Sequence, residues 1–469
     1  MASERLSGSG FLPEGHIPKG YKILVANRGE IAVRIIRACR NMGIRSVAIY
    51  SKEDERSLHV QLADQRICIG EGPARNSYLN MDRIISAALN VEADAIHPGF
   101  GFLSENSDFV RKCQENHIVF IGPQADVMDK MGNKSQARKT MMEAGIPVVP
   151  GTKESVYDAE KGRALAGEIG YPVMIKASSG GGGKGMRVAR SDAEFEEQFN
   201  LAQRESANAF GDDTMYLERF IESPRHVEIQ IMADTMGHVV SLGDRDCSVQ
   251  RNHQKLIEES PSPAVSEEIR QEMNRCAVLA AEAVGYTNAG TIEFIVDQKG
   301  DFYFMEMNTR IQVEHGVTEM VTGTDLIIEQ IRVAMGEPLS FTQEEVVPRG
   351  HAIECRINAE IPEMNFMPSP GVIEHMHLPA GNGVRVDTGI YTGYRIPPEY
   401  DSMIAKVIVH GPTREAAIRK MMCALDEMLI VGVKTNLDFQ YQIMRHPLFR
   451  EGRAHTEFIE KMMKLKEKV

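Results

Sequence analysis

The sequence predicts an α/β protein with an N-terminal doubly wound parallel sheet and a larger C-terminal region of the α+β type. The N-terminal prediction depends on a buried-strand pattern at residues 23–26, an amphipathic helix pattern from Glu30 and a second apolar strand at residues 46–50. Strands that alternate with helices in this way predict a parallel sheet. The C-terminal prediction depends on several strands with one polar face, which are interrupted by long helix patterns.

The first strand–helix unit carries no dinucleotide fingerprint. Its turn lies at residues 27–29, and the following helix places Ile31, Ile35 and Cys39 at intervals of four residues. Because the turn lacks the GxGxxG motif, a dinucleotide site is not expected. A third strand, at residues 95–96, leads into a loop. Open α/β sheets bind their ligands at loops that follow strands, so this loop is a candidate binding segment.

Length and charge limit the possible functions. A chain of 469 residues is expected to form two or three domains with a large core. The net charge of −13 argues against nucleic acid or an anionic membrane as the main partner. An anion site must therefore be locally basic. No apolar run approaches the roughly 20 residues of a membrane span, so no membrane segment is expected.

The cysteines and the N-terminal residues predict a cytoplasmic protein. Residues 1–20 are rich in Ser, Gly and Pro and have no apolar stretch, so we expect a flexible arm rather than a secretory signal, with a docking segment as the alternative. The cysteines are scattered without a CxxC pair, which predicts buried thiols in a reducing compartment. They are Cys39, Cys68, Cys113, Cys247, Cys276, Cys355 and Cys423.

A long helix is expected in the middle of the chain. It is predicted to run from Asp129 through Lys134 to Ala144, and to stop at Gly145. A second sheet unit is expected to follow, beginning near Val148.

A glycine-rich stretch at residues 178–188 follows a predicted strand at residues 172–177. Strand patterns on both sides favour a hairpin loop whose unhindered backbone N–H groups cover phosphates. The GxxxxGK[ST] spacing does not fit, because Gly185 directly follows Lys184. A mobile linker is the alternative interpretation.

Two alternating segments, at residues 291–296 and 302–308, predict a hairpin with two glutamates on one face. If the hairpin is centred on residues 299–300, Glu293 lies opposite Glu306 with Cβ atoms roughly 5 Å apart. Like charges at that spacing destabilise a sheet unless a positive charge lies between them. Asn308 adds a third oxygen, and three oxygen ligands suit Mg²⁺ or Mn²⁺. A solvated sheet face that carries two acids by chance is the alternative.

Further polar strand faces suggest that the metal site continues into a cleft. If the hairpin strand stays extended beyond Asn308, Arg310, Gln312 and Glu314 point to one side. A basic side chain beside a metal site indicates an anionic substrate, whereas a polar edge strand would look similar. Two other strands have comparable faces, which carry His226, Glu228 and Gln230 in one case and Glu354, Arg356 and Asn358 in the other.

Taken together, a nucleotide-type fold, a glycine loop, a two-carboxylate metal site and a basic cluster indicate phosphoryl transfer from ATP. Residues 306–315, Glu-Met-Asn-Thr-Arg-Ile-Gln-Val-Glu-His, closely resemble the signature of the biotin carboxylases, a family of the ATP-grasp superfamily. The resemblance extends from about Tyr21 to the C-terminus. Other segments match the family in the same order, namely residues 27–32, 97–99, 180–186, 251–255 and 354–360.

The resemblance implies an activity, a domain organisation and partners. The implied activity is ATP- and bicarbonate-dependent carboxylation of biotin, through carboxyphosphate, while biotin is held on a biotin carboxyl carrier protein. Carboxyltransferase subunits and a homodimer are further expected partners, with Arg34, Arg37 and Arg385 as candidate dimer contacts. The implied divisions are an arm at 1–20, an N-terminal domain at 21–133, a mobile ATP-grasp lid region at 134–220 and a catalytic core with the C-terminal domain at 221–469.

The resemblance also implies a role for each matching residue. It places the ATP contacts at Lys134, Lys176, Gly180, Gly181, Gly182, Gly183, Glu218, His226, His253 and Gln254. It places Mg²⁺ or Mn²⁺, at two sites, on Glu293, Glu306 and Asn308. It places bicarbonate and biotin at Lys255, Arg310, Gln312, Val313, Glu314, Arg356 and Phe100. Among these, Glu314 resembles the base that deprotonates bicarbonate, Lys255 and Arg310 resemble the cations that hold it, and Arg356 resembles the group that stabilises the biotin enolate.

Three departures from the family pattern and two other functions remain open at this point. Phe100 replaces a Tyr, Gly316 replaces a Pro, and residues 361–366 are one residue longer than expected. A different ATP-grasp ligase would not need Lys255, Arg310, Glu314 and Arg356 together. A non-catalytic ATP-binding regulator would be expected to have lost a metal ligand or the base, and none is missing.

Overall fold

The computed structural model describes residues 18–152, 154–177, 185–210 and 212–466. The glycine run at residues 180–183 and most of the expected N-terminal arm lie outside the described residues. The chain forms two compact units. Unit 1 consists of residues 1–133, 225–293 and 306–469, and unit 2 consists of residues 134–224 and 294–305.

Unit 1 contains the predicted N-terminal parallel sheet. Its strand order is β3-β2-β1-β4-β5 and all neighbours are parallel, which confirms the doubly wound prediction. The strands are β1 (Lys22–Val25), β2 (Arg45–Ser51), β3 (Gln65–Gly70), β4 (Ala95–His97) and β5 (Val119–Phe120). Its helices are α1 (Gly29–Asn41), α2 (Leu58–Leu62), α3 (Met81–Asn90), α4 (Ser107–Glu115) and α5 (Ala125–Gly132). The amide of Asn27 joins the turn before α1 to the loop after β4 by donating to Pro98 O and Phe100 O, both at 2.7 Å.

The second sheet has eight strands in the order β13-β12-β9-β10-β11-β14-β21-β19. The neighbouring strands from β9 to β19 in this order are antiparallel, in agreement with the α+β prediction. The strands are β9 (Arg225–Ala233), β10 (Val239–Arg251), β11 (Gln254–Ser260), β12 (Asn288–Val296), β13 (Phe302–Asn308), β14 (His351–Asn358), β19 (Val384–Thr388) and β21 (Met403–Gly411). Three two-stranded ribbons accompany it, β15 (Glu360–Ile361) with β16 (Met367–Pro368), β17 (Gly371–Val372) with β20 (Arg395–Ile396), and β18 (His375–His377) with β22 (Leu429–Val431).

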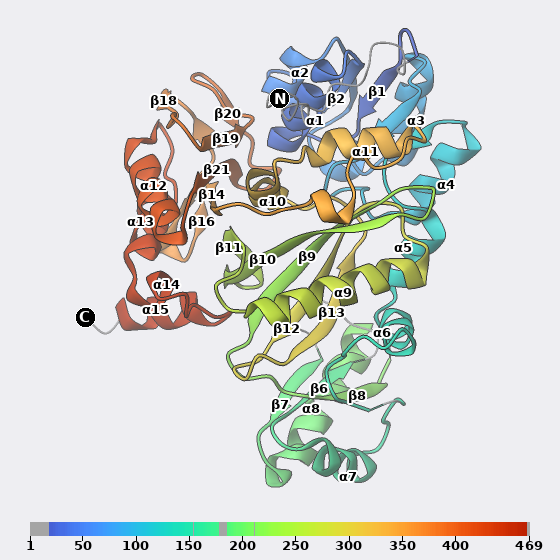
Figure 1. The fold of residues 1–469 in the computed structure, drawn as a ribbon, viewed down its shortest axis with the longest axis vertical. Helices are drawn as coiled ribbons and strands as arrows, with labels where there is room; N and C mark the ends of the chain where they lie inside the picture. Colours follow the sequence, from blue (N-terminus) through green and yellow to red (C-terminus); the bar gives the residue numbers. More distant parts are fainter. Residues whose placement is uncertain (1–17, 153, 178–184, 211, 467–469) are drawn as a thin grey trace, which may run out of the picture. The chain divides into compact units, whose positions relative to one another are not determined.

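Helices pack against this sheet where the sequence predicts start and stop signals. Helix α9 (Glu267–Val284) is capped by the Ser266 hydroxyl at its N-terminus, and by Gly285 in the left-handed conformation at its C-terminus. Helix α12 (Arg414–Glu427) has Thr413 as its N-cap and lies beside α13 (Leu437–Arg445) over β14 and β21 (Figure 1). The remaining helices of unit 1 are α10 (His315–Thr322), α11 (Leu326–Ala334), α14 (Pro447–Arg450) and α15 (Phe458–Lys466).

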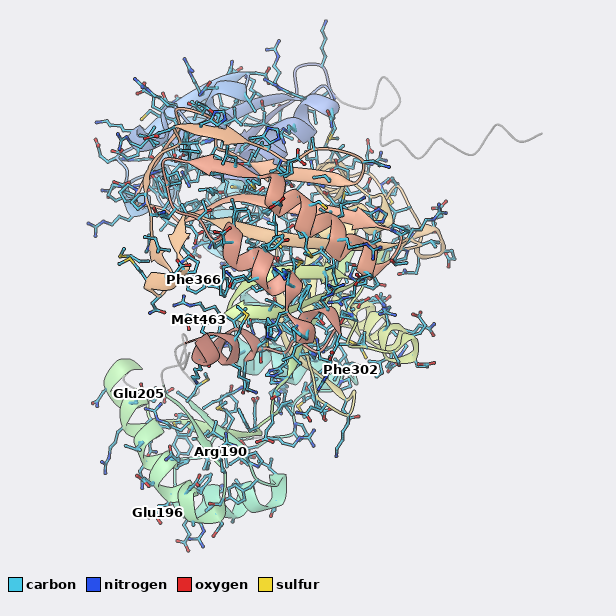
Figure 2. All side chains as sticks on the ribbon, turned by 90° about the vertical axis from the view of Figure 1, so that its left-hand side faces the viewer. Arg190, Glu196, Glu205, Phe302, Phe366 and Met463 are labelled. Carbon is cyan, nitrogen blue, oxygen red and sulfur yellow. The ribbon has the colours of Figure 1, made fainter. Side chains whose placement is uncertain are left out.

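Unit 2 contains a three-stranded antiparallel sheet with the order β7-β6-β8. Its elements are α6 (Lys134–Glu143), α7 (Ala159–Ile169), β6 (Val173–Ala177), β7 (Met186–Ala189), α8 (Asp192–Phe210) and β8 (Met215–Arg219). Phe195 and Phe199 of α8 are buried in its core, whereas Glu196 and Arg190 are exposed (Figure 2). Because Val173 pairs with Ala189, the glycine-rich stretch connects two antiparallel neighbours, as predicted.

Two secondary-structure predictions are wrong. The single helix expected at residues 129–144 is divided into α5 and α6, because Asn133 is extended with φ −83° and ψ 105°. The strand expected to continue through residues 310–315 ends at Asn308, and the chain turns into α10 at His315.

The cysteine prediction holds only in part. All seven are free thiols, but Cys68 and Cys423 are exposed. Within the described residues, no helix is both long enough and apolar enough to cross a membrane.

A buried ion pair stabilises the region around the start of α1. The Arg28 guanidinium donates to both oxygens of Asp54, at 2.6 and 2.8 Å, and it stacks on the Tyr400 ring at 4.0 Å. Tyr78 and Ser57 donate two more hydrogen bonds to the same carboxylate. Burial alone would raise the pKa of Asp54, but the hydrogen bond and charge of Arg28 bring it down to about 2. Asp54 is therefore a charged group inside the core.

We expect Asp54→Asn to lower the free energy of unfolding by about 3–5 kcal/mol, because it leaves the buried Arg28 without its counter-charge. In the wild type this contribution is present above the ordinary pKa of 3.8 and is lost as the pH falls toward about 2. Urea unfolding at pH 7 measures the loss. Glu71→Gln is the matched control, since its pair with Lys52 is exposed and should contribute little. Equal effects of the two substitutions would contradict this account.

Candidate active site

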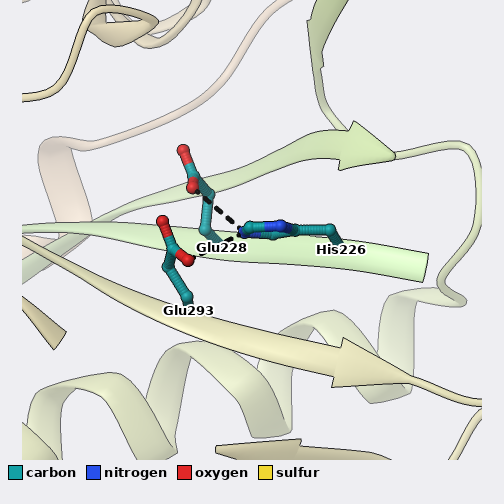
Figure 3. Close-up of side chains that lie close together, drawn as sticks. All are labelled: His226, Glu228 and Glu293. Carbon is teal, nitrogen blue, oxygen red and sulfur yellow. Dashed lines mark ion pairs between the residues drawn. The ribbon is translucent and has the colours of Figure 1, made fainter. Parts of the chain in front are cut away.

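Glu293 on β12 is the centre of a buried polar cluster in unit 1. Its Oε1 accepts hydrogen bonds from Asn308 Nδ2 at 2.8 Å, Gln312 Nε2 at 2.9 Å and Lys255 Nζ at 3.0 Å. Its Oε2 lies 3.1 Å from His226 Nε2, and the same imidazole nitrogen lies 3.6 Å from Glu228 (Figure 3). Four residues that the sequence assigned to the metal, the nucleotide or bicarbonate therefore meet at one carboxylate.

Lys255 on β11 joins three acids. Its ammonium lies 2.6 Å from Glu228 Oε2, 2.6 Å from Glu314 Oε1 and 3.0 Å from Glu293 Oε1. Burial alone would lower the pKa of Lys255, but the neighbouring Cys247 and the three carboxylates raise it well above its usual range. The ammonium is therefore charged, and it supplies a positive charge beside Glu293.

Glu314 follows the hairpin and lies between two cations. Its Oε1 contacts Lys255, and its Oε2 accepts from an Arg356 terminal nitrogen at 2.9 Å. Burial alone would raise the pKa of Glu314, but Lys255 and Arg356 bring it down to about 2. The side chain is therefore a carboxylate at neutral pH. The base and the enolate-stabilising group that the sequence predicted are in direct contact.

Arg356 on β14 has a second acid partner. Its Nε donates to Glu258 Oε1 at 2.6 Å, whereas the other oxygen, Glu258 Oε2, has no hydrogen-bond partner among the described residues. Burial raises the pKa of Glu258 to about 7 although Arg356 opposes the shift. The acid partners of Arg356 are therefore Glu258 and Glu314.

Arg245 on β10 is a central residue that the sequence analysis missed. It is fully buried, and it donates to Glu228 Oε1 at 2.6 Å, Gln230 Oε1 at 2.7 Å and Gln312 Oε1 at 2.6 Å. The sequence held only a weak signal for Arg245. The residue stands directly opposite Glu228, but this pairing depends on the β9–β10 register. It fixes the amide of Gln312 so that its nitrogen faces Glu293.

Six further predicted site residues belong to unit 1. Arg310 donates to Glu105 Oε2 at 2.8 Å and to Asn308 Oδ1 at 3.1 Å, so it reaches the Glu293 cluster through Asn308. His253 and Gln254 are exposed at the turn between β10 and β11. The remaining residues are Glu306, which is half-buried on β13, Val313, which is half-buried before α10, and Phe100, which is half-buried against the core of the N-terminal sheet.

Unit 2 brings together two of the predicted nucleotide contacts. Lys176 on β6 forms an ion pair with Glu218 on the neighbouring strand β8. Arg138 on α6 donates to the same carboxylate at 3.4 Å. Lys134 is exposed at the first position of α6.

The donor set fits a hard cation. Glu293 and Asn308 are hydrogen-bonded to each other, and both offer oxygens of the type that Mg²⁺ prefers. Lys255 and His226 supply charge that balances Glu293.

The fold and the site define an ATP-grasp protein, and comparison with known sequences identifies the family. Three family models match, biotin carboxylase N-terminal domain at residues 19–128, carbamoyl-phosphate synthase L chain ATP binding domain at 133–342, and biotin carboxylase C-terminal domain at 354–461. The chain is 56% identical to biotin carboxylase of Nostoc sp. over 443 residues, which cover 94% of this chain and 99% of that protein. It is 57% identical to biotin carboxylase 1 of Bacillus subtilis over 440 residues, with 94% and 98% covered. The chain belongs to the biotin carboxylase family.

Solved structures agree with this assignment. The Campylobacter jejuni biotin carboxylase complex with a βγ-ATP ligand has a TM-score of 0.88 and 48% identity, over 94% of this chain and 98% of that one. The biotin carboxylase domain dimer of the Hydrogenobacter thermophilus 2-oxoglutarate carboxylase, solved with MgADP, ADP and bicarbonate, has a TM-score of 0.87 and 48% identity, over 94% and 97%. The three-part biotin carboxylase fold predicted from the sequence is thus confirmed.

Proposed function

We propose that the protein carboxylates biotin with bicarbonate and ATP, and that carboxyphosphate is the intermediate. The products are carboxybiotin, ADP and phosphate, so the protein is an ATP-dependent carbon–nitrogen ligase. The observation that carries the proposal is the contact of Glu314 with both Lys255 and Arg356 inside a buried cluster. Membership of the biotin carboxylase family supports it.

The bicarbonate pocket consists of Lys255, Arg310, Gln312, the Val313 backbone and Glu314. A base whose pKa is about 2 is too weak to deprotonate bicarbonate efficiently. When the Lys255 ammonium turns to an incoming anion, Glu314 loses part of the charge that lowers its pKa, and it becomes a stronger base. Anion binding and activation of the base are then one event.

The reaction proceeds in two stages. Glu314 takes the proton of bicarbonate, and the resulting oxyanion attacks the γ-phosphorus of ATP while the bond to ADP breaks. Because both reactants are held in place, the attack gains effective molarity. Carboxyphosphate then releases CO₂ and phosphate. The released phosphate takes the proton from N1′ of biotin, and the resulting enolate, whose oxygen is stabilised by Arg356, attacks CO₂ to form the N1′–carbon bond.

Glu293, Glu306 and Asn308 are the residues that would hold Mg²⁺, or Mn²⁺, at two sites. Bound metal neutralises charge on the transferring phosphoryl group. The nucleotide contacts in this proposal are Lys134, Lys176, Gly180, Gly181, Gly182, Gly183, Glu218, His226, His253 and Gln254. The MgADP and bicarbonate of the Hydrogenobacter thermophilus structure support these ligands.

The partners in this proposal are a biotin carboxyl carrier protein, carboxyltransferase subunits and a second copy of this chain. The dimer in the Hydrogenobacter thermophilus structure supports a homodimer. Arg34, Arg37 and Arg385 line one concave surface of unit 1, where Arg34 and Arg385 both pair with Glu319. A cytoplasmic location also belongs to the proposal, although the plant relatives are named chloroplastic.

A bicarbonate-dependent ATPase assay with free biotin tests the function. We expect ADP release that requires ATP, Mg²⁺ and bicarbonate, and carboxybiotin that forms only when biotin is added. ATP cleavage that ignores bicarbonate would indicate a different ATP-grasp ligase. ATP binding without any cleavage would indicate a regulator.

The double substitution Glu293→Gln, Glu306→Gln should remove the dependence of ATP cleavage on Mg²⁺ concentration together with most of the activity. The reason is that both proposed metal carboxylates lose their charge. A magnesium titration of the bicarbonate-dependent ATPase measures the effect. Glu196→Gln, Glu197→Gln removes the same charge from exposed positions of α8 and should titrate like the wild type. A wild-type magnesium titration in the Glu293, Glu306 variant would refute the metal assignment.

The same double substitution is also expected to lower stability. Sequence reasoning alone suggested that removing one of two opposed acids relieves repulsion. The structure reverses that expectation, since Glu293 is the counter-charge of Lys255 and His226. Thermal unfolding without ligands should show a lower midpoint than the wild type.

A further inference from the structure

A second buried ionic cluster lies behind the proposed bicarbonate pocket in unit 1. Lys406 on β21 is completely buried. Its ammonium lies 3.4 Å from Glu30 Oε1 on α1, 3.9 Å from Asp387 Oδ2 on β19 and 4.0 Å from Glu354 Oε2 on β14. A buried ammonium costs several kcal/mol of lost hydration unless its surroundings compensate for it. The contacts of Lys406 should therefore show which group the buried ammonium stabilises.

The shortest contact of Lys406 is to the main chain and not to an acid. Its Nζ donates to the carbonyl oxygen of Val313 at 2.5 Å. By contrast, both carboxylate oxygens of Glu30 and of Glu354 have no hydrogen-bond partner among the described residues. The lysine is thus directed at the segment that carries the proposed base.

The need to neutralise buried acids does not by itself explain why Lys406 is buried at this position. Burial raises the pKa of Glu30 and raises that of Glu354 well above its usual range. Both groups can therefore hold a proton instead of a charge. Asp387 has its own cation, because Arg385 donates to it at 2.7 Å. The Val313 carbonyl is the partner that depends on the lysine.

Residues 309–314 lie between β13 and α10 without regular secondary structure. The peptide group between Gln312 and Val313 is held by His315, whose backbone N–H and ring Nδ1 reach Gln312 O at 3.3 and 2.8 Å. The peptide group between Val313 and Glu314 is held by Lys406. Both peptide groups that flank Val313 are therefore fixed. Within the described part of the chain, no group accepts a hydrogen bond from the Val313 N–H.

We propose that Lys406 is a positioning residue for the bicarbonate pocket, which fixes the Val313–Glu314 peptide so that the Glu314 carboxylate faces the anion. This inference rests on the proposed function. Lys406 does not touch the substrate, and it acts through the main chain. The competing explanation is that Lys406 serves only as the counter-charge of Glu30 and Glu354.

A charge-balanced set of variants separates the two explanations. Lys406→Met alone removes both the counter-charge and the donor. The triple variant Glu30→Gln, Glu354→Gln, Lys406→Met removes the donor and also the acids. The matched control is Glu30→Gln, Glu354→Gln, which keeps the donor and leaves the proposed substrate contacts untouched. The measurements are the thermal midpoint, kcat, and KM for bicarbonate and for ATP.

We expect the triple variant to fold like the control and to show a KM for bicarbonate raised about 10- to 100-fold, the equivalent of losing one charge-assisted hydrogen bond. The KM of the triple variant for ATP should stay within about twofold of the control. A general disturbance of the site would instead change the KM for bicarbonate and the KM for ATP together. A triple variant that fails to fold, or one that has the control KM for bicarbonate, overturns the proposal. Absence of bicarbonate-dependent ATP cleavage in the wild type would instead overturn the proposed function, so the two failures are distinguishable.

Discussion

Glu314→Gln is expected to abolish both bicarbonate-dependent ATP cleavage and carboxybiotin formation. An amide cannot take the proton of bicarbonate, so the nucleophile for the γ-phosphorus is not produced. Loss of a positioned base commonly costs about 10²–10⁴ in rate. Coupled measurement of ADP release and of carboxybiotin from labelled bicarbonate gives both numbers in one experiment.

Stability has to be controlled, because Glu314 is buried between two cations. Lys255 keeps Glu228 and Glu293 as partners in the variant, and Arg356 keeps Glu258, so the substitution leaves no cation alone. Glu259→Gln is a suitable control. It removes a buried acid of the same sheet whose partners are His351 and Arg414. We expect the control to lose stability but to keep its dependence on bicarbonate, whereas bicarbonate-dependent cleavage retained by Glu314→Gln would exclude Glu314 as the base.

Strand alternation explains why much of the cluster could be predicted. Glu293 on one hairpin strand and Asn308 on the other are in contact, as expected from residues that share a sheet face. His226 and Glu228 on β9 meet the same group, and Arg356 on β14 reaches it through Glu314. Two-residue periodicity places side chains on a face whatever the distant partner is. The direct opposition of Glu306 to Glu293 stays a prediction.

The errors arise where local pattern and tertiary structure disagree. Residues 310–315 alternate like a strand, yet the carbonyl of Gln312 bonds to His315 and turns the chain into α10. From this turned segment, Arg310 contacts both Glu105 and Asn308. The helix expected at residues 129–144 breaks after Gly132, and Gly followed by Asn is a weak local signal that helix periodicity concealed.

The residues that sequence reasoning missed act through partners far along the chain. Arg245 binds Gln312, and Lys406 binds the carbonyl of Val313. Glu258 is the partner of Arg356 although 98 positions separate them. Neither composition nor periodicity specifies such pairs, because they depend on the order of strands in the sheet. Gly316, which replaces a Pro of the family pattern, lies within the first turn of α10.

Arg356→Ala is expected to reduce carboxybiotin formation far more than ATP cleavage, and so to leave an uncoupled ATPase. In the proposed mechanism the guanidinium stabilises the enolate of biotin after CO₂ has formed, and it does not take the proton of the bicarbonate that attacks ATP. The ratio of ADP released to carboxybiotin formed measures the uncoupling. In the wild type this ratio should approach one-to-one coupling when biotin is saturating.

We expect the Arg356→Ala variant to fold, because Glu258 can take up a proton when its cation is removed. Its pKa is already about 7 because of burial, and loss of the arginine removes a charge that lowers it, so the acid takes up a proton rather than remaining buried and unpaired. Glu258→Gln is the matched control, because it removes the charge of the same partner while keeping the cation. If Arg356 were only a structural partner of Glu258, both variants would lower stability and both activities together. A raised ADP-to-carboxybiotin ratio in Arg356→Ala alone is the result that assigns Arg356 to the second stage of the reaction.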